Sequence, residues 1–244
     1  MRRAVLSWSG GKDCTLALCA LRDGTAGDSS TDDPSAGDPS SDSGTARVES
    51  LLTTVTPEHD RVSMHGVRTR LVERQAAALG LSLRTVEIPA GCATDRYRDL
   101  LVDGLRDCRR HGVEAVVYAD LHLEDVRAAR ERTLKRVDLT GHWPLWGRDT
   151  ETLARAFVDL GFEARVVCVD AEALDRSFVG RRFDRSLLSD LPAGVDPCGE
   201  NGEFHTFVTD GPPFERAVPV RTAGVVDREL GEGQFRYADL VAAD

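Results

Sequence analysis

The chain has 244 residues, of which 41% are hydrophobic and 30% are charged, and its formal net charge is −10. This length and composition indicate one large α/β domain, or a domain with a smaller companion. The negative charge disfavours generic nucleic-acid binding, which needs a basic surface. No apolar run approaches the roughly 20 residues of a membrane helix, and the apolar stretch after Met1 is too short for a signal peptide. We therefore expect a cytoplasmic protein with no membrane partner.

The six cysteines are scattered and form no C-x-x-C pair. They are Cys14, Cys19, Cys92, Cys108, Cys168 and Cys198. This spacing argues against a zinc ribbon, an iron–sulfur cluster and a thioredoxin-like motif. We expect most of them to be small buried hydrophobic residues. Lysine occurs only at positions 12 and 135, so a lysine in a glycine-rich stretch at position 12 stands out.

Strands and helices alternate over the first 140 residues. Strands are expected at 3–8, 49–55, 83–88 and 115–119, and helices at 14–22, 66–79, 95–111 and 123–135. The segment 23–46 consists of small and acidic residues, and predicts a disordered acidic insertion. The alternation predicts an α/β fold with a parallel sheet that is covered on both faces and binds its ligand at the carboxyl ends of the strands.

The pattern changes after residue 141. A turn rich in aromatic residues is followed by an expected helix at 150–160, a strand at 164–169, a helical segment at 178–191 and a strand at 204–208. A glycine-rich segment precedes the last strand. These elements predict a smaller C-terminal α+β domain at 142–244, after a first domain at 1–141.

The segment Ser9-Gly10-Gly11-Lys12-Asp13 lies between the first expected strand and the first expected helix. Glycines let a backbone approach an anion, and the free N–H groups of a helix N-terminus favour negative charge. Lys12 adds a positive charge, while Asp13 can bind Mg²⁺ or cap the helix. The segment is neither a Walker A sequence nor a dinucleotide fingerprint. It predicts a phosphate-binding loop, with a tight capped turn as the alternative.

This loop resembles the pyrophosphate-binding PP-loop of the N-type ATP pyrophosphatases, also called adenine nucleotide alpha hydrolases. Three further segments, RVSMHGV (61–67), HWPLWGRD (142–149) and DPCGENGEFHTFVTDGP (196–212), together resemble the diphthine–ammonia ligase family. The resemblance covers nearly all of the chain except 23–46. It implies a Rossmann-like adenine nucleotide alpha hydrolase fold, in which residues 1–141 bind ATP and residues 142–244 bind the acceptor.

The resemblance also implies an activity, that of an ATP-dependent, AMP-forming amide ligase. In this family the carboxylate of diphthine, a modified histidine of elongation factor 2, attacks the α-phosphate of ATP. Ammonia then displaces AMP and leaves diphthamide. ATP and Mg²⁺ are the implied cofactors, and diphthine-bearing elongation factor 2 and ammonia are the implied partners. The sequence leaves a homodimer open.

Site roles follow from the resemblance residue by residue. The residues expected to bind the nucleotide are Ser7, Ser9, Gly10, Gly11, Lys12, Asp13, Cys14, Thr53, Thr54, His65 and Asp120. The residues expected to face the acceptor are Trp146, Gly199, Glu200, Asn201, Gly202, Glu203, His205 and Thr206. The expected catalytic residues are Lys12, Asp13, Glu200 and Glu203, and Asp13 is the expected metal ligand.

Several of these residues keep a purely structural alternative. Asn201-Gly202 also favours a hairpin turn, which would present Glu200 and Glu203 on either side. Trp146 belongs to a segment that could equally be an aromatic plug between the domains. The acidic residues after Asp120 also suit the first turn of a helix.

Three positions depart from the family pattern. Cys14 stands where the loop usually ends in serine, and a thiol at a helix N-terminus can have a depressed pKa and be redox-sensitive. Asn201 replaces a glycine and His205 replaces a glutamate. ATP binding is therefore better supported than diphthine as the substrate. The alternatives are a paralogous ATP pyrophosphatase acting on another carboxylate or carbonyl acceptor, and a non-catalytic adenine-nucleotide sensor.

Overall fold

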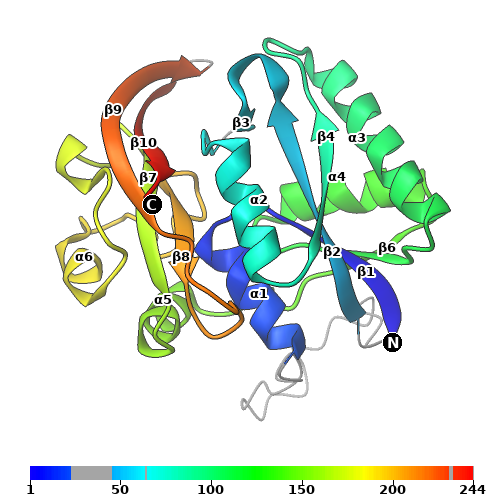
Figure 1. Cartoon of the computed structure of the whole chain (residues 1–244), viewed down its shortest axis with the longest axis horizontal. Coiled ribbons are helices and arrows are strands. Elements are labelled where there is room, and N and C mark those ends of the chain that lie inside the picture. Colours follow the sequence, from blue (N-terminus) through cyan, green and yellow to red (C-terminus); the bar gives the residue numbers. More distant parts are fainter. Residues whose placement is uncertain (23–45, 64, 231–232, 244) are drawn as a thin grey trace.

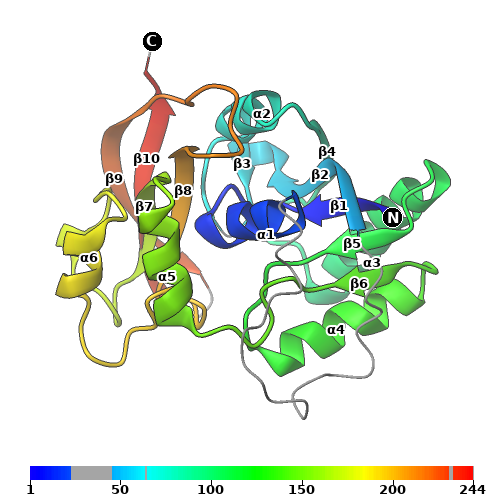
Figure 2. The ribbon, with the colours of Figure 1, turned by 90° about the horizontal axis from the view of Figure 1, so that it is seen from below.

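The structure is a computed structural model that describes residues 1–22, 46–63, 65–230 and 233–243. Its described elements form two sheets that lie side by side, with helices between and around them (Figures 1 and 2). The insertion expected at 23–46 lies outside the described residues, apart from Ala46, which opens a strand.

The first sheet is built from strands in the N-terminal part of the chain. They are β1 (Arg2–Ser7), β2 (Ala46–Thr56), β3 (Arg61–Val62), β4 (Ser82–Glu87), β5 (Ala115–Val117) and β6 (Thr140–His142). The elements that connect them are α1 (Lys12–Arg22), η2 (Pro57–His59), α2 (Thr69–Ala78), α3 (Thr94–Arg110) and α4 (Glu124–Lys135).

The second sheet is built from the C-terminal part. Its strands are β7 (Glu163–Asp170), β8 (Phe204–Asp210), β9 (Val220–Leu230) and β10 (Gly233–Ala242). Its accompanying helices are α5 (Thr150–Asp159), η3 (Arg176–Phe178) and α6 (Arg185–Asp190). Strand order in this sheet is β8-β7-β10-β9, with every neighbouring pair antiparallel.

The first sheet has the strand order of a doubly wound α/β fold. β1 pairs in parallel with β2 and β5, β2 with β4, and β5 with β6, whereas β3 adds a short antiparallel pair to β2. The chain therefore builds outward from β1 to β4 and then returns to the other side of β1. Ligands bind where the order reverses in this way. The expected α/β class, with a parallel sheet and a smaller C-terminal unit, is confirmed.

Successive residues of β1 point to opposite faces of the first sheet. Ala4 and Leu6 belong to the core cluster shared with α1, α2 and the second sheet. Val5 belongs to the cluster that α3 and α4 cover. All three are fully buried, as a parallel sheet between two layers requires. Figure 2 shows α1 in the space between the two sheets, so one helix packs against both.

Two expected helices are shorter than their patterns indicated. The helix expected at 66–79 begins only at Thr69, because Val62 N–H donates to the Val67 carbonyl (2.8 Å) and Gly66 has a φ of 68°, so this part is a hairpin. The helical segment expected at 178–191 is α6 alone. Residues 180–183 instead exchange backbone hydrogen bonds with β7.

Four strands of the structure were not predicted from the sequence: two are only two or three residues long, and two lie at the C-terminal end. β3, β6, β9 and β10 were all missed. β6 carries the first sheet one residue past the expected domain boundary at 141, and it contains Gly141, where a Cβ would lie 2.2 Å from the Trp143 ring. The domain boundary itself stays a prediction.

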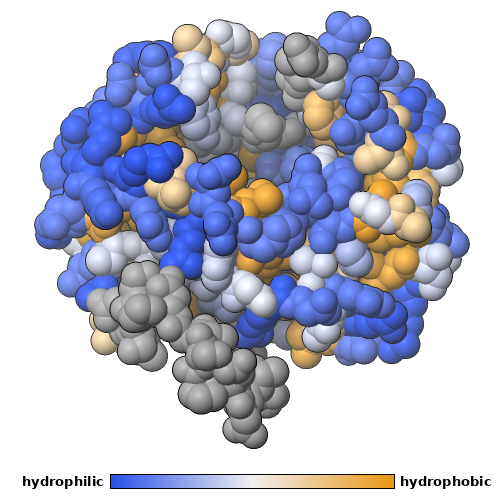
Figure 3. All heavy atoms as spheres, turned by 180° about the vertical axis from the view of Figure 1, so that it is seen from behind, coloured by the Kyte–Doolittle hydropathy of each residue, from blue (hydrophilic) through white to orange (hydrophobic). Residues whose placement is uncertain are grey.

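The described surface is largely polar. Figure 3 shows one face on which hydrophilic residues dominate and hydrophobic ones form smaller areas between them. Large hydrophobic residues that are exposed among the described ones are Met1, Leu160 and Val226. Among the described helices, none is both long enough and apolar enough to cross a membrane.

Gln75 of α2 is a fully buried polar side chain that joins three elements. Its amide oxygen accepts from Trp8 Nε1 (3.0 Å), and its amide nitrogen donates to the carbonyls of Gly10 (3.0 Å) and Val208 (2.6 Å). A Cβ at Gly10 would lie 2.7 Å from this amide oxygen. Gln75 therefore ties the glycine-rich turn to β8 as well as to α2.

We expect Gln75→Leu to lower the free energy of unfolding by about 3 kcal/mol, because several buried polar groups lose their partners. The matched control is Glu73→Leu, which puts the same residue on the exposed side of the same helix and should stay within about 0.5 kcal/mol. Urea unfolding of both variants measures the difference. Equal stability of the two variants would contradict the role of Gln75.

Candidate functional site

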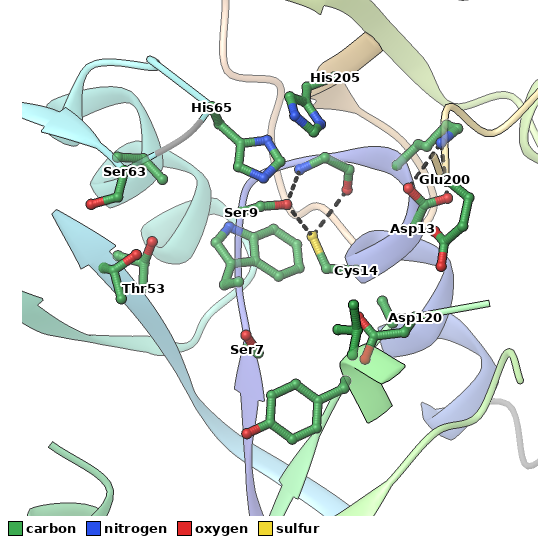
Figure 4. Close-up of a pocket in the computed structure, with 18 of the residues that line it drawn as sticks. Ser7, Ser9, Asp13, Cys14, Thr53, Ser63, His65, Asp120, Glu200 and His205 are labelled. Carbon is green, nitrogen blue, oxygen red and sulfur yellow. Dashed lines mark hydrogen bonds and ion pairs between the residues drawn. The ribbon is translucent and has the colours of Figure 1, made fainter. Parts of the chain in front are cut away.

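A cavity of about 470 Å³, called here the central cavity, lies at the carboxyl ends of β1, β2 and β5. Its walls come from both halves of the chain: the segment 7–14 and residues of β2, α3 and α4 on one side, and the segment 198–206 on the other. Figure 4 shows residues from these segments around one opening. The cavity thus sits where the strand order of the first sheet reverses.

Most of the predicted site residues line the central cavity. Those that do are Ser7, Ser9, Gly11, Lys12, Asp13, Cys14, Thr53, Thr54, His65, Asp120, Gly199, Glu200, His205 and Thr206. Gly10, Trp146, Asn201, Gly202 and Glu203 are not among its lining residues. The segments 7–14 and 198–206, which lie about 190 residues apart in the sequence, therefore line the same cavity.

The glycine-rich turn leads from β1 directly into α1. Gly10 has a φ of 85°, which favours glycine, and α1 begins two residues later, at Lys12. The Gly11 N–H donates to Ser9 Oγ (3.3 Å), and a Cβ on Gly11 would come within 3.2 Å of the Thr206 carbonyl. The turn therefore leaves no room for side chains where it faces the second segment.

Lys12 is buried, with only 2% of its surface exposed. Its ammonium donates to both carboxylate oxygens of Asp13 (2.9 and 2.8 Å) and to the carbonyl of Cys198. The rings of Phe183 and Phe204 lie 5.8 and 5.6 Å from the nitrogen. Burial is the largest single influence and lowers the pKa of Lys12, but Asp13, Cys198 and Glu200 together outweigh it, so the pKa of Lys12 is raised. Lys12 thus carries its charge at neutral pH.

The second segment is anchored to the first sheet at three points. Lys12 holds the Cys198 carbonyl with its side chain and the Thr206 hydroxyl with its backbone N–H (3.1 Å). Glu200 accepts a hydrogen bond from the backbone N–H of Leu121 (2.7 Å). These contacts fix Glu200 on the cavity wall beside Asp13 and Asp120 (Figure 4).

Glu200 is a carboxylate in an environment that disfavours its charge. Burial raises the pKa of Glu200, and the charges of Asp13 and Asp120 raise it further, whereas the Leu121 N–H works in the opposite direction. A carboxylate with a raised pKa is a stronger base than an exposed one. Glu200 is therefore suited to exchange a proton with a ligand in the cavity.

Glu203, expected as a second catalytic carboxylate, is only 9% exposed and is engaged by the backbone. It accepts from the N–H groups of Asp196 (3.0 Å) and Asn201 (3.0 Å) and from the Asn201 side-chain amide (3.1 Å). These bonds close the turn at 196–203. In this arrangement Glu203 shapes the turn that carries Glu200, and its catalytic role stays a prediction.

The opposite wall offers polar groups at the end of β2. Thr53 is buried, and its hydroxyl has no hydrogen-bond partner among the described residues. The Thr54 carbonyl already accepts from the Ser63 N–H (2.9 Å). An unpaired buried hydroxyl is costly unless a ligand or water satisfies it. Thr53 thus marks a place where a polar group of a ligand fits.

A stack of aromatic rings and arginines forms the wall near α4. Tyr118 and Trp143 stack with ring centroids 5.5 Å apart, and the Arg130 guanidinium lies 4.2 Å from the Tyr118 ring. Asp120 accepts from Arg130 (2.8 Å) and from Trp143 Nε1 (3.0 Å). Because both partners bind Asp120, this carboxylate is held in place at the cavity edge.

Trp146 is not among the residues that line the cavity and lies against α4. The Arg127 guanidinium is 4.9 Å from the Trp143 ring and 4.7 Å from the Trp146 ring. Leu145, between the two tryptophans, is buried in the core. This segment packs α4 against the rest of the molecule, and an acceptor contact by Trp146 stays a prediction.

His65 and His205 face each other across the boundary between the two sheets. Their ring centroids are 4.2 Å apart with an interplanar angle of 44°, although they lie in the β3–α2 connection and in β8. Burial, followed by the charge of Lys12, lowers the pKa of His205 to about 4. Burial, then His205 and Lys12, hold the pKa of His65 well below its usual value. Both rings are therefore neutral at pH 7.

The sequence analysis missed many lining residues. They are Trp8, Leu52, Val62, Ser63, Tyr97, Leu101, Val116, Tyr118, Ala119, Leu123, Val126, Arg130, Cys198 and Phe204. Trp8 and Tyr118 had a usable signal, since each directly follows a strand whose carboxyl end faces the ligand crevice. Tyr97 and Leu101 follow an ordinary amphipathic pattern on α3 and carry no local signal.

The expectation of a depressed pKa at Cys14 is wrong. Its thiol is 3% exposed, donates to the Gly11 carbonyl (3.2 Å) and contacts Ser9 Oγ (3.3 Å). Burial raises the pKa of Cys14, and this effect exceeds the opposing hydrogen bond from Ser9. Burial here prevails over the helix N-terminus, so the redox sensitivity expected for a thiolate loses its basis.

We expect Cys14 to resist alkylation in the folded protein, because the thiolate is the reacting form and its raised pKa keeps the sulfur protonated at pH 7.5. Cys92, which is half-buried near the start of α3, serves as the control. Iodoacetamide labelling followed by peptide mass spectrometry should modify Cys92 well before Cys14. Faster labelling of Cys14 would contradict the structure.

Comparison with known proteins supports the resemblance that the motifs indicated. Residues 149–231 match the family model described as the diphthamide synthase C-terminal domain. The chain is similar to the diphthine–ammonia ligase of Homo sapiens, with 28% identity over 178 residues, which cover 70% of this chain and 66% of the human protein. The aligned part therefore spans just under two thirds of that relative's length.

Two further similarities are more limited. The diphthine–ammonia ligase of Schizosaccharomyces pombe is 32% identical over 110 residues, which cover 43% of this chain and 18% of the yeast protein. A solved structure, described as a predicted subunit of tRNA methyltransferase from Methanocaldococcus jannaschii, aligns over 87% of this chain and 98% of that chain, at 13% identity and a TM-score of 0.39.

The sequence similarity reaches beyond the matched C-terminal domain into the half of the chain that carries the glycine-rich turn, because 70% of the chain aligns with the human protein. The resemblance of this chain to the diphthine–ammonia ligase family is thereby confirmed.

Proposed function

We propose that this protein is an ATP-dependent ligase that forms AMP and pyrophosphate while converting a carboxylate into an amide. The observation that carries the proposal is the meeting of the glycine-rich turn 9–13 and the segment 196–206 in one cavity at the switch point of the first sheet. The similarity to diphthine–ammonia ligases supports the same reaction class. A phosphate loop and a carboxylate-bearing segment are the two parts that this reaction needs.

The nucleotide is assigned to the side of the cavity formed by β1, β2 and α1. Its β and γ phosphates would lie against the turn, where the start of α1 favours negative charge, and the Gly11 and Lys12 N–H groups, which donate to Ser9 and Thr206 in the free protein, would exchange these partners for phosphate oxygens. Thr53 would offer its unpaired hydroxyl to the nucleoside end. The chain's own contribution is positioning and charge, which supply most of the catalysis in such displacements.

Mg²⁺ is the cation expected with ATP, and Asp13 is its candidate ligand. Among the described residues there is no group of three or more histidine, cysteine, aspartate or glutamate side chains that could form a metal cage. Mg²⁺ needs only one or two protein carboxylates when phosphates and water supply the remaining oxygens. Asp13 fits that requirement once a nucleotide is bound, although Lys12 holds both of its oxygens in the free protein. The ion would balance the phosphate charge.

The acceptor is assigned to the side formed by Asp120, Gly199 and Glu200. Glu200 would take a proton from ammonium, which leaves neutral ammonia to attack the acyl adenylate and release AMP. Its raised pKa and its fixed position against Leu121 support this assignment. For the acceptor itself we propose diphthine on elongation factor 2, the substrate that the relatives' name indicates. This partner also favours the cytoplasmic location expected from the sequence.

A different acceptor is the second candidate, and His205 favours it. This position carries a glutamate in the family pattern, so the cavity of this chain has one negative charge fewer with which to attract a cationic acceptor such as diphthine. A carboxylate acceptor that lacks a cationic group would suit the two histidines better. AMP formation with another carboxylate, but not with diphthine, would support this candidate, and ATP binding without AMP formation would support a nucleotide sensor.

We expect Lys12→Ala to weaken ATP binding by about tenfold or more, because a charge-assisted contact and the order of the loop are both lost. Lys135→Ala is the matched control, since the only other lysine is exposed on the last turn of α4. Isothermal titration with ATP compares the two variants, and a thermal melt of each confirms folding. Equal affinity in both variants would remove the loop from the nucleotide site.

We expect Glu200→Gln to retain ATP binding and to reduce acceptor-dependent AMP release by about 100-fold, the range found for loss of a general base. The assay incubates the protein with ATP, Mg²⁺, ammonium and diphthine-bearing elongation factor 2, and quantifies AMP by chromatography. In the wild type, AMP should appear only with both acceptor and ammonium, and mass spectrometry should show the acid converted to an amide.

Glu203→Gln is the control for this experiment. It keeps the size of the side chain and disturbs the turn at 196–203, so it should lower thermal stability more than Glu200→Gln while leaving more of the activity. A Glu200→Gln variant that releases AMP at the wild-type rate would exclude Glu200 as the base.

A further inference from the structure

We propose that His65 and His205 together form a polyphosphate-binding pair that takes up a proton when the pyrophosphate part of a nucleotide enters the central cavity. The proposal deepens the proposed function, since it rests on nucleotide binding in this cavity. It assigns to the two histidines a joint role that neither carries alone.

The two histidines lie beside the glycine-rich turn on the wall of the central cavity. Both rings line the cavity, and Figure 4 shows His65 next to the Ser9–Gly11 turn with His205 directly beyond it. A polyphosphate bound on the N–H groups of this turn would therefore have both imidazoles as neighbours. One ring comes from the first sheet and the other from the second sheet, so the ligand would contact both halves of the protein.

The hydrogen bonding of His65 is incomplete in the free protein. Nδ1 of His65 is buried and has no hydrogen-bond partner among the described residues. A buried polar atom without a partner is costly and often marks a place where a ligand or water belongs. The free protein thus leaves hydrogen-bonding capacity unused next to the phosphate loop. A protonated imidazole donates from both nitrogens, which a phosphate anion can accept.

Burial and the charges around the two histidines keep both rings neutral in the free protein. Burial and the cation Lys12 act on both rings, and His205 further disfavours a proton on His65. Around the His65 loop, Arg61 and Arg68 both bind Asp239 of β10 (2.9 and 2.8 Å), so these charges are largely compensated. The free pair is neutral for these reasons. A polyphosphate brings several negative charges to the same place, which reverses the balance and favours an imidazolium.

The loop that carries His65 is built to hold this geometry. A Cβ on Gly66 would lie 2.6 Å from the Tyr237 ring, so the loop packs directly on β10. Arg61 also donates to the Gly66 carbonyl (2.7 Å). The separation of the two rings is therefore set by contact between the β3–α2 connection and the second sheet.

The test is calorimetric titration of the full chain at pH 7 with three probes: pyrophosphate, α,β-methylene-ATP and AMP. Each titration is repeated in buffers of different ionisation enthalpy, which yields the number of protons taken up. Wild type, His65→Gln and His205→Gln are compared, with the exposed His111→Gln as the matched control. Comparing variants with the same probe cancels the protonation of the probe itself.

We expect pyrophosphate and the ATP analogue to bring about one more proton into the wild type and the His111→Gln control than into either cavity variant. AMP, which lacks the β and γ phosphates, should show no such difference. Because binding consumes a proton, the wild-type affinity for pyrophosphate relative to the variants should fall as the pH rises from 6 to 8.

Imidazole nitrogen chemical shifts provide an independent readout. We expect both cavity histidines to be neutral in the free protein at pH 7 and one of them to become an imidazolium when pyrophosphate binds. Probe binding with the same proton count in wild type and cavity variants, and with both rings still neutral, would overturn the histidine pair while leaving nucleotide binding intact. No binding of any probe would overturn the proposed nucleotide site and the pair together.

Discussion

The buried ammonium of Lys12 is the interaction on which the site depends. It is enclosed by the Asp13 carboxylate, the Cys198 carbonyl and two phenylalanine rings, and it joins the start of α1 to the segment before β8. A buried charge is stable only when its partners are in place. Folding of the second sheet against α1 therefore supplies what Lys12 needs, and Lys12 in turn fixes the second segment over the glycine-rich turn.

The same junction is reinforced by neutral groups. Gln75 binds Trp8, Gly10 and Val208, and the backbone N–H of Lys12 binds Thr206. These bonds hold the turn in one conformation. If the turn binds phosphate as proposed, its order in the free protein raises the affinity, because less entropy is lost on binding.

Carboxylates and neutral histidines occupy different sides of the central cavity. Asp13, Asp120 and Glu200 gather on one side, where their mutual repulsion and burial raise the pKa of Glu200. The two histidines lie on the other side, where Lys12 and burial keep them neutral. The carboxylate side suits a cation such as ammonium, and the histidine side can become positive toward phosphate. One cavity thus offers two environments, matched to the two kinds of substrate in the proposed reaction.

Local sequence determined the parts of this protein that need no distant partner. The strand 2–7, the turn 9–13 and helix 12–22 follow from an apolar run, two glycines and an amphipathic pattern, and these residues predicted a phosphate-binding loop. Tertiary structure decided what depends on contacts far apart in the chain. β6, with Gly141 against Trp143, pairs with β5. Cys14 has a raised pKa because it is buried in the core of the folded protein. Glu203 serves the turn at 196–203 rather than the cavity wall. The meeting of His65 with His205 has the same origin, since a 140-residue separation carries no local signal and only the packing of two sheets brings the rings together.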